Sequence, residues 1–400
     1  MSERIVIVGG GQAAGIAAAS LREQGHTGEI VILGDEPRGP YQRPPLSKNF
    51  LAGQVSAEQL QLKPARFYDE RGITLRTGTR VGSIDRAHRS VSLHDGSRLE
   101  YAKLLLATGA RPRRLDIPGA ELPGVHYLRT VSDVEAIRHE MVAGKRLTIV
   151  GGGYIGLEAA AVAVKAGLVV TVLEAGARIL NRVSGPATAE FFAAEHHRQG
   201  VDIRCDACVE AIEGDDHVRA VVSTAGAIAS DLVVIGVGIE PAVELAAAAG
   251  LACDNGIVVD EFTRTSDPDI HAAGDCTNHP NALLGRRVRL ESVQNAVDQA
   301  RAAAANICGK VQAYAELPWF WSNQYDLRLQ IAGLSQGYEE TLMRGDPADR
   351  TFSVMYLAKG KLIAVDTVNA PRDHLAFRKL IAAGGDVDAA RLTDPALPVA

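Results

Sequence analysis

The chain has 400 residues, which at about 150 residues per domain allows two or three domains and excludes a small disulfide-stapled module. Its 42 Lys and Arg and 48 Asp and Glu give a net charge of −6 with both signs scattered along the sequence, which argues against a nucleic-acid partner. The five cysteines are odd in number and irregularly spaced, so we expect no disulfide framework and a cytoplasmic location. No membrane partner is expected, because the most apolar stretch, residues 159–173, contains a lysine and is shorter than the roughly 20 residues of a span.

An internal repeat organises the first part of the chain. The apolar residues 5–8 and 147–150 each lead into a glycine cluster. An alanine-rich helical stretch and a second apolar run, at residues 30–33 and 169–173, follow each cluster. Strand, glycine turn, helix and strand in this order form the βαβ unit of a parallel sheet. The sequence therefore predicts an α/β protein with two Rossmann-type dinucleotide-binding domains.

The first glycine cluster reads Gly9-x-Gly11-x-x-Ala14, with alanine as a tolerated replacement for the third glycine of the dinucleotide fingerprint. The first glycine makes a tight turn, and the second lets the backbone approach a pyrophosphate at the positive end of the helix. Asp35 and Glu36 follow the next apolar run, where an acid can accept hydrogen bonds from an adenosine ribose. These residues predict the first dinucleotide site.

The second cluster, Gly151-x-Gly153-x-x-Gly156, is a complete fingerprint, and Glu174 ends the next apolar run. Glu174 suits ribose hydroxyls and would repel a 2′-phosphate, so NADH is favoured over NADPH. Arg178 and Arg182 lie just beyond and leave open the alternative that an inward-turned arginine holds the phosphate. Two dinucleotide sites in one chain most simply pass electrons between two dinucleotides, and FAD and NADH are the expected pair.

Three further apolar strands end in residues that suit chain crossings or cofactor contacts. The strand before residue 107 ends in a glycine turn typical of a chain leaving a flavin domain, although an ordinary strand end would look the same. A similar strand before residue 238 would return the chain, and the strand before residue 275 ends in an acid. That acid can cap a following helix or bind a ribityl hydroxyl. The residues at these strand ends are Ala107, Thr108, Gly109, Gly238 and Asp275.

Alternating apolar and polar residues replace the glycine turns after residue 319. This pattern predicts an antiparallel sheet with a terminal helix near residues 374–383. We expect three domains. They are a discontinuous FAD-binding domain of residues 1–112 and 242–318, an NAD-binding domain of residues 113–241, and a C-terminal α+β domain of residues 319–400.

Four motifs, in this order, carry a resemblance to a known family. They read PYQRPPLSK at residues 40–48, GGGYIGLE at 151–158, TSDP through GDC at 265–276, and PWFWSNQY at 318–325. The chain resembles the FAD-dependent NADH:ferredoxin reductases of bacterial oxygenase systems, which are putidaredoxin reductase-like and have a glutathione reductase-like fold. Two residues depart from the family pattern. Ala14 replaces the third glycine, and Asn323 stands where the family usually has aspartate. Neither change removes a group that the chemistry requires.

The resemblance implies a role for each matching residue. Lys48 and Glu158 would be catalytic: they would meet near flavin N5, where a cation stabilises the anionic reduced flavin, and Glu158 would position Lys48 and the nicotinamide. The alternatives are that Lys48 is a solvated charge at a helix end and that Trp321 is an ordinary core residue.

The implied FAD contacts are Asp35 and Glu36 at the ribose, Arg43 and Lys48 at the pyrophosphate and isoalloxazine, Val81 and Arg129 at the adenine side, Asp275 at the ribityl chain, Val293 at the pyrimidine end of the ring and Trp321 beside it. Ile155 lies within the second glycine motif and is assigned to the cofactor contacts with it, and no metal site is expected.

The implied function is a flavoprotein oxidoreductase that transfers electrons from NADH through FAD to a [2Fe–2S] ferredoxin. That ferredoxin would feed an oxygenase, a cytochrome P450 by preference or a Rieske dioxygenase as the alternative. An NADH oxidase and a flavoprotein like apoptosis-inducing factor are the rival classes. An acidic ferredoxin needs a local basic docking surface. The candidates for it are Lys63, Arg66, Arg286, Arg287, Arg289, Arg301 and Lys310.

The lack of a cysteine pair near the expected flavin site argues against disulfide reduction. Related flavoproteins that reduce disulfides place a cysteine pair against the flavin, and residues 41–48 contain no cysteine. Electrons should therefore leave one at a time. Cys205 and Cys208 lie in a strand-like stretch without features that lower a thiol pKa, so we expect them to be inert. His196 and His197 have no spaced partner and are expected on a solvated helix.

Overall fold

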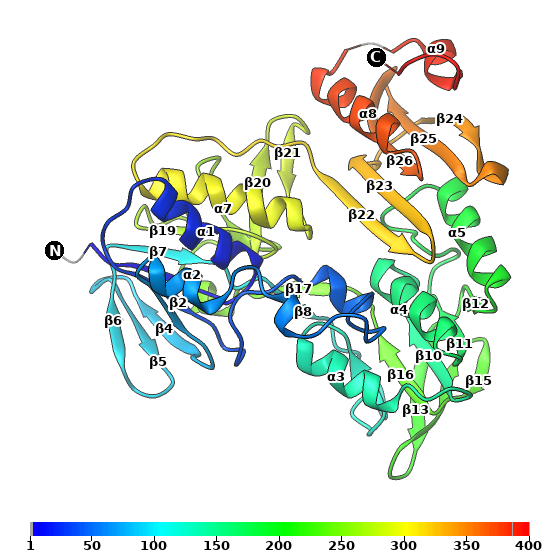
Figure 1. Ribbon diagram of the computed structural model, residues 1–400, viewed down its shortest axis with the longest axis horizontal. Helices are drawn as coiled ribbons and strands as arrows, with labels where there is room; N and C mark the ends of the chain where they lie inside the picture. Colours follow the sequence, from blue (N-terminus) through cyan, green and yellow to red (C-terminus); the bar gives the residue numbers. More distant parts are fainter. Residues whose placement is uncertain (1–2, 386, 400) are drawn as a thin grey trace. The chain divides into compact units, whose positions relative to one another are not determined.

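The computed structural model describes residues 3–385 and 387–399 (Figure 1). By packing, the chain divides into two compact units. Unit 1 comprises Met1–Arg43, Glu58–Arg111 and Glu240–Pro318, and unit 2 comprises Pro44–Ala57, Pro112–Ile239 and Trp319–Ala400. The division into three domains is finer than this and stays a prediction.

Unit 1 is built on a five-stranded parallel sheet in the order β19-β7-β1-β2-β3. The first predicted repeat forms here, because α1 connects the parallel neighbours β1 and β2. All four residues of β1 and of β2 are buried, as expected for a parallel sheet covered on both faces. The elements of this layer are β1 (Ile5–Val8), α1 (Gln12–Glu23), β2 (Ile30–Leu33), β3 (Ile73–Arg76), β7 (Lys103–Leu106), β19 (Ile270–Ala272) and α7 (Val293–Ile307).

Alanines let α1 and α7 approach each other closely on one face of this sheet, and the two helices lie side by side in Figure 1. Ala17 of α1 and Ala303 of α7 belong to the same core, and neither is exposed to solvent. The other face is covered partly by a three-stranded antiparallel sheet. The remaining elements are η2 (Glu58–Leu60), α2 (Ala65–Glu70), β4 (Val81–Asp85), β5 (Ser90–Leu93), β6 (Arg98–Glu100), α6 (Glu244–Ala248), β18 (Ile257–Val258), β20 (Thr277–Asn281) and β21 (Arg286–Val288), with β8 (Ala110–Pro112) and β17 (Ile239–Pro241) where the chain passes between the units.

Unit 2 repeats the parallel arrangement in the order β12-β11-β10-β16-β9. The second predicted repeat forms here, with α4 connecting β10 and β11. An antiparallel sheet of β13, β14 and β15 packs beside it. The elements are η1 (Pro44–Ser47), β9 (Val125–Tyr127), α3 (Val131–Glu140), β10 (Arg146–Val150), α4 (Tyr154–Lys165), β11 (Val169–Leu173), α5 (Pro186–Arg198), β12 (Asp202–Arg204), β13 (Val209–Gly214), β14 (Val218–Ser223), β15 (Gly226–Ala229) and β16 (Leu232–Ile235).

The C-terminal part of unit 2 is a five-stranded antiparallel sheet in the order β22-β23-β26-β25-β24. Its strands share one core with α4 and α5, in which Leu157, Phe192, Leu329 and Tyr356 are buried together. Helix α8 packs on β23 and β26. The elements are β22 (Trp319–Gln324), β23 (Leu327–Gly333), β24 (Glu340–Asp346), η3 (Pro347–Asp349), β25 (Thr351–Ala358), β26 (Lys361–Val368), α8 (Pro371–Ala383) and α9 (Ala389–Thr393).

Two local predictions are wrong. Cys205 and Cys208 do not lie in one strand, because β12 ends at Arg204 and β13 begins at Val209, with Asp206 at a φ of 52° between them. His196 is not solvated: it is 0% exposed, since this face of α5 packs against the C-terminal sheet.

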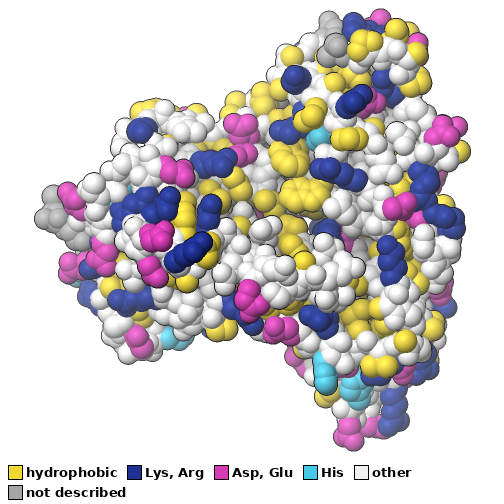
Figure 2. Space-filling model, in the orientation of Figure 1, with side chains coloured by type: hydrophobic (Ala, Val, Ile, Leu, Met, Phe, Trp, Pro, Cys, Tyr) yellow, Lys and Arg dark blue, Asp and Glu magenta, His cyan; other side chains and the backbone are white. Residues whose placement is uncertain are grey.

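No helix within the described residues is long and apolar enough to cross a membrane. On the face shown in Figure 2, basic and acidic side chains are interspersed, as the balanced composition predicts.

Candidate active site

The turn between β1 and α1 has the geometry that its glycines predict. Gly9 has a φ of +122°, and a Cβ there would lie 2.1 Å from the Ala107 carbonyl oxygen. Gly11 begins α1 without a side-chain cap, and a Cβ at Gly11 would meet nothing within 4 Å. The first amides of a helix have no partner within the helix. This turn therefore offers unpaired donors, positive helix potential and room, which fit a pyrophosphate.

The turn between β10 and α4 has the same construction. Gly151 has a φ of +108°, and a Cβ there would lie 2.5 Å from the Gly236 carbonyl oxygen. A Cβ at Gly156 would lie 2.2 Å from the Gly151 carbonyl oxygen, so only glycine lets the helix pack this closely. Gly153 begins α4 uncapped with no atom within 4 Å of its Cβ position. The second turn is therefore a second uncapped helix start with open space beside its glycine.

Helices elsewhere in the fold begin in both ways, because α3 and α7 have side-chain caps while α2, α5, α6 and α8 have none. Thr130 caps α3 by accepting a hydrogen bond from the Asp133 amide, and the Asp133 side chain completes a capping box. Ser292 caps α7 by accepting from the Asn295 amide. Side chains thus satisfy the first turn of α3 and α7, whereas α1 and α4 begin uncapped at a glycine shortly after a buried parallel strand.

Glu174 is held at the second glycine turn. Its carboxylate accepts hydrogen bonds from the amides of Gly152 at 2.7 Å and Gly176 at 2.8 Å. A carboxylate has further lone pairs, so it can still accept from ribose hydroxyls. Arg182 lies over Gly238, with its Nη2 3.2 Å from the position that a Cβ would take there. The predicted residues of the NAD side in unit 2, including Gly238 and Arg182, are therefore brought together around one turn.

A second group of predicted residues gathers in unit 1. Glu36 accepts hydrogen bonds from Arg43 Nη2 at 2.6 Å and Tyr41 Oη at 2.5 Å, while Asp35 is exposed. Burial opposes the charge of Arg43, but the neighbouring Tyr41, Glu36 and Asp275 together raise its pKa. A permanently charged guanidinium in a half-buried network suits a dinucleotide phosphate or ribose.

The other predicted FAD contacts fall in both units. Thr108 Oγ1 donates to the Ala242 carbonyl at 2.7 Å, and Gly109 has a φ of 67°, so the strand end after β7 is a tight crossing. Asp275 precedes the strand β20 rather than a helix, which removes the helix-capping alternative. In unit 1 lie Ala14, Val81, Ala107, Thr108, Gly109, Asp275 and Val293, and in unit 2 lie Arg129 and Trp321. Ile155, which was assigned with the second glycine motif, also lies in unit 2.

Lys48 and Glu158 form an ion pair within unit 2. The Lys48 Nζ lies 2.5 Å from Glu158 Oε2, and Glu158 is 1% exposed on α4. Ser47 Oγ donates to the same oxygen at 2.5 Å, and Ser322 Oγ donates to Glu158 Oε1 at 2.6 Å. Lys48 is therefore not a solvated helix-end charge. A buried carboxylate with several donors is a fixed partner for the ammonium group.

Sequence reasoning missed the two serines. Ser47 and Ser322 both lie inside motifs that were recognised, but serine is common in loops and strands for other reasons. The available signal is the spacing in β22, where Ser322 and Gln324 must share one face. Which face turns toward Glu158 depends on the packing of the sheet against α4, which no local pattern contains.

Aromatic rings line the strand that carries Trp321. The Trp321 ring lies 5.5 Å from that of Trp319 and 6.3 Å from that of Phe320, measured between centroids. Phe320 also contacts Tyr154 at the start of α4, at 4.7 Å. Trp321 is half-buried, so it is not plain core.

The surroundings of two cysteines and of two predicted docking residues bear on their expected roles. Burial raises the pKa of the thiols of Cys205 and Cys276, which makes both poor nucleophiles. The guanidinium of Arg287 donates to the Val259 carbonyl at 2.7 Å, and Arg289 is 13% exposed and paired with Glu291 at 2.7 Å. Arg289 is therefore a poor candidate for a docking surface, whereas Arg287 is exposed and stays a candidate.

Two uncapped glycine turns on duplicated βαβ units are the arrangement expected of a protein that binds two dinucleotides. The sequence model of the pyridine nucleotide-disulphide oxidoreductases matches residues 3–300, and that of the reductase C-terminal domain matches residues 319–400. The chain belongs to the pyridine nucleotide-disulphide oxidoreductase family, and its cofactors are FAD and NADH.

Curated relatives and solved structures match over almost the whole chain. The rhodocoxin reductase of Rhodococcus erythropolis is 47% identical over 94% of this chain and 89% of that protein. The anthranilate 1,2-dioxygenase system ferredoxin–NAD(+) reductase component of Burkholderia cepacia is 44% identical over 98% of each. The crystal structure of the covalent putidaredoxin reductase–putidaredoxin complex matches with a TM-score of 0.97 and 43% identity, covering 99% of this chain and 97% of that chain.

Proposed function

We propose that the protein is an NADH:ferredoxin reductase that transfers electrons from NADH through FAD to a [2Fe–2S] ferredoxin serving an oxygenase. The observation that carries the proposal is the pair of open, uncapped helix starts at Gly11 and Gly153, one in each unit. Each follows a buried parallel strand and has an acid nearby in the chain. Two such openings suit two dinucleotides, which is what an enzyme connecting a hydride donor to a one-electron acceptor requires.

On the NAD side, the residues of unit 2 bind and orient the nucleotide. The α4 amides at Gly153 would receive the pyrophosphate, and Glu174 would accept from the adenosine ribose. The negative charge of Glu174, fixed by two backbone amides, disfavours the 2′-phosphate of NADPH. Arg182 and Ile155 would complete the site around the turn.

On the FAD side, the residues of unit 1 would hold the pyrophosphate at Gly11 and the ribose and ribityl groups near Glu36, Arg43 and Asp275. Bound FAD supplies the two-electron to one-electron conversion. Lys48 would stabilise negative charge at the flavin ring, and Glu158 would fix the direction of the Lys48 ammonium group. The other FAD contacts would be Gly9, Ala14, Asp35, Val81, Ala107, Thr108, Gly109, Arg129, Val293 and Trp321.

Two observations support a ferredoxin as the acceptor. The region that carries Lys48, residues 41–48, has no cysteine to accept electrons as a disulfide. The relatives include a ferredoxin–NAD(+) reductase component and a reductase solved in complex with putidaredoxin. We propose a cytochrome P450 as the final oxygenase, and a dioxygenase system as in the Burkholderia cepacia relative is the alternative. The five free cysteines support a cytoplasmic location.

The test follows NADH oxidation by the purified FAD-loaded protein, with and without a [2Fe–2S] ferredoxin and cytochrome c. We expect cytochrome reduction that requires ferredoxin and prefers NADH to NADPH. Rapid NADH oxidation in air that ferredoxin does not accelerate would instead identify an oxidase. Supplying either a P450 or a Rieske oxygenase with its substrate then distinguishes the two oxygenase classes by product formation.

A docking surface on unit 1 should make ferredoxin reduction sensitive to salt. Lys63 and Arg66 are exposed next to each other on α2 and the residues before it, and Arg286 and Arg301 are also exposed. Charge attraction to an acidic ferredoxin weakens once the Debye length shortens to about 8 Å at 0.15 M salt. We expect the ferredoxin-dependent rate to fall severalfold between 0.02 and about 0.3 M salt. A rate that is flat across this range would contradict the basic dock.

A further inference from the structure

A continuous chain of hydrogen bonds runs through unit 2 from Glu158 to Tyr325. Ser322 Oγ donates to Glu158 Oε1 at 2.6 Å, and Gln324 Nε2 donates to Ser322 Oγ at 3.1 Å. His196 Nε2 lies 2.8 Å from Gln324 Oε1, and Tyr325 Oη lies 2.8 Å from His196 Nδ1. Glu158, Ser322, Gln324 and His196 are each at most 1% exposed. We call these five residues the Glu158 relay.

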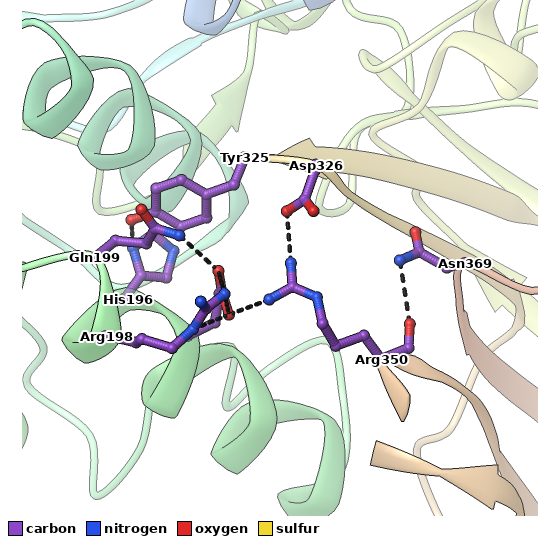
Figure 3. A network of polar contacts seen from close by, with 8 residues as sticks. His196, Arg198, Gln199, Tyr325, Asp326, Arg350 and Asn369 are labelled. Atoms are coloured by element: carbon purple, nitrogen blue, oxygen red, sulfur yellow. Dashed lines mark hydrogen bonds and ion pairs between the residues drawn. The ribbon is translucent and has the colours of Figure 1, made fainter. Parts of the chain in front are cut away.

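Four segments bring the Glu158 relay together, and the first is α4, which carries Glu158. Ser322 and Gln324 are two residues apart in β22, so they share a face, while Asn323 between them is exposed on the other. His196 comes from the last turns of α5. Tyr325 has a φ of 58° at the turn after β22, and Figure 3 shows its ring next to His196.

Donor and acceptor chemistry permits only one direction along the relay. Ser322 has a single hydroxyl proton and gives it to the Glu158 carboxylate, so Ser322 Oγ must accept from the Gln324 amide nitrogen. The Gln324 oxygen then faces His196, whose Nε2 must carry a proton. His196 Nδ1 is left bare and accepts the Tyr325 hydroxyl proton. Burial lowers the pKa of His196 to about 4, which agrees with this neutral tautomer.

Ion pairs hold the outer end of the relay in place. Arg350 donates to Glu195 Oε2 at 2.8 Å and to Asp326 Oδ1 at 2.5 Å, joining α5 to the turn that carries Tyr325. Arg198 also pairs with Glu195 at 2.6 Å. Figure 3 shows Arg350 between Asp326 and the last turns of α5. The tyrosine at the end of the relay is therefore not free to swing away.

We propose that Ser322, Gln324 and His196, anchored by Tyr325, are positioning residues that fix the orientation of the Glu158 carboxylate and, through it, of the Lys48 ammonium group. Glu158 Oε2 accepts hydrogen bonds from Lys48 and Ser47, and Glu158 Oε1 accepts the hydrogen bond from Ser322 that begins the relay. The C-terminal sheet of unit 2 would thus contribute to the hydride-accepting site as well as to the fold. This inference rests on the proposed function of Lys48 and Glu158.

Such a relay has a clear advantage for catalysis. A carboxylate held by one oxygen can rotate about its last bond, and the cation that it directs then samples several positions. Misplacement of a catalytic group by about 1 Å can cost up to about a hundredfold in rate. Fully satisfied buried networks are rigid and select one arrangement. The relay therefore affects the limiting rate of hydride transfer more than the affinity for NADH.

The experiment measures anaerobic bleaching of the FAD-loaded protein by NADH in a stopped-flow instrument. The dependence on NADH concentration separates the limiting rate from the NADH Kd. For Ser322→Ala we expect a limiting rate lower by about tenfold with a Kd changed less than about twofold. For Tyr325→Phe, which loosens only the far end, we expect a smaller loss of about threefold.

Ser353→Ala is the matched control. Ser353 is 0% exposed in β25 of the same sheet, and its hydroxyl has no hydrogen-bond partner in the described structure. The control therefore removes a buried serine hydroxyl outside the relay. We expect it to keep the wild-type limiting rate. Flavin content and melting temperature are measured for every variant to confirm that each one is folded.

A double-mutant cycle separates positioning from a general structural effect. In a Lys48→Gln background, Ser322→Ala should lower the limiting rate by less than about twofold, because its target is already absent. Equal losses in both backgrounds, or an unchanged limiting rate in folded Ser322→Ala protein, would overturn the relay. If Lys48→Gln alone leaves bleaching unchanged, the proposed role of Lys48 fails first. If Lys48→Gln slows bleaching and Ser322→Ala does not, only the relay fails.

Discussion

Glu174 is the residue on which nucleotide choice should depend most. The Gly152 and Gly176 amides hold its carboxylate at the glycine turn. Glu174→Ala removes both the ribose acceptor and the repulsion of a 2′-phosphate, so we expect the NADH KM to rise about tenfold and the NADPH KM to fall. Steady-state kinetics with both nucleotides measure the change. A wild-type protein that already prefers NADPH would contradict this assignment.

Single residues also mark where sequence reasoning ends. The glycines, Glu174 and the Lys48–Glu158 pair lie in motifs whose chemistry is local, and their placement could be predicted. His196 could not be: it precedes the exposed His197 in α5, and its burial depends on the strand β22 from far along the chain. Tertiary packing, and no local pattern, makes it a buried group in the Glu158 relay.

Two neighbouring glycines before α1 should have different roles: Gly9 is needed for folding, and Gly11 is needed for FAD binding. Gly9 has a positive φ and no room for a Cβ, so Gly9→Ala should destabilise the protein by about 3 kcal/mol or more. Gly11 has an ordinary φ of −93° and open space. Gly11→Ala should therefore fold normally but lose FAD, because the added methyl group occupies the phosphate opening.

Melting temperatures and bound flavin absorbance measure this difference. Gly153→Ala is the counterpart on α4, where we expect full flavin content and a raised KM for NADH. Gly25→Ala, at a glycine with positive φ and open space at the far end of α1, controls for backbone strain alone. Normal FAD content in Gly11→Ala would mean that the phosphate does not lie at this helix start.

The elements themselves were largely predictable, because their signals are local. Runs of buried β-branched residues gave the parallel strands, and alternation gave the C-terminal sheet. The stretch around Cys205 was not predictable, since its apolar residues suggest one strand while Asp206 turns the chain. The shared core of α4, α5 and the C-terminal sheet also has no local signature.

At the scale of the whole molecule, buried titratable groups set the response to acid. Burial lowers the pKa of His196, His271, His279 and His374 to about 4 from 6.5. Between these values the unfolded chain binds more protons than the native protein, so the stability that these groups contribute is present above pH 6.5 and lost as pH falls through 4. Burial raises the pKa of Asp366 to about 6, and that single group acts in the opposite direction, losing stability as pH rises through 6.

Burial lowers the pKa of His26 as well, so within the described residues five histidines oppose one aspartate, which predicts net destabilisation between pH 6.5 and 4. His374 has both ring nitrogens buried without a hydrogen-bond partner in the described structure, so His374→Leu removes one of these groups. We expect a shallower fall of stability, by about 1.4 kcal/mol per pH unit within this window. Denaturant unfolding at several pH values measures the slope, and His197→Gln, at an exposed position, is the control. An unchanged slope would show that His374 is protonated in the native protein.

The open starts of α1 and α4 also make the two nucleotide sites separately observable. Backbone amides without a hydrogen-bond acceptor exchange their hydrogens with heavy water quickly, and a bound phosphate would protect them. Peptides containing residues 11–14 and 153–156 should therefore slow their deuterium uptake independently, the first with FAD and the second with a nicotinamide nucleotide. The starts of α3 and α7, already capped by Thr130 and Ser292, provide internal references in the same spectrum. One mass-spectrometric titration can thus report the occupancy of each site without any measurement of turnover.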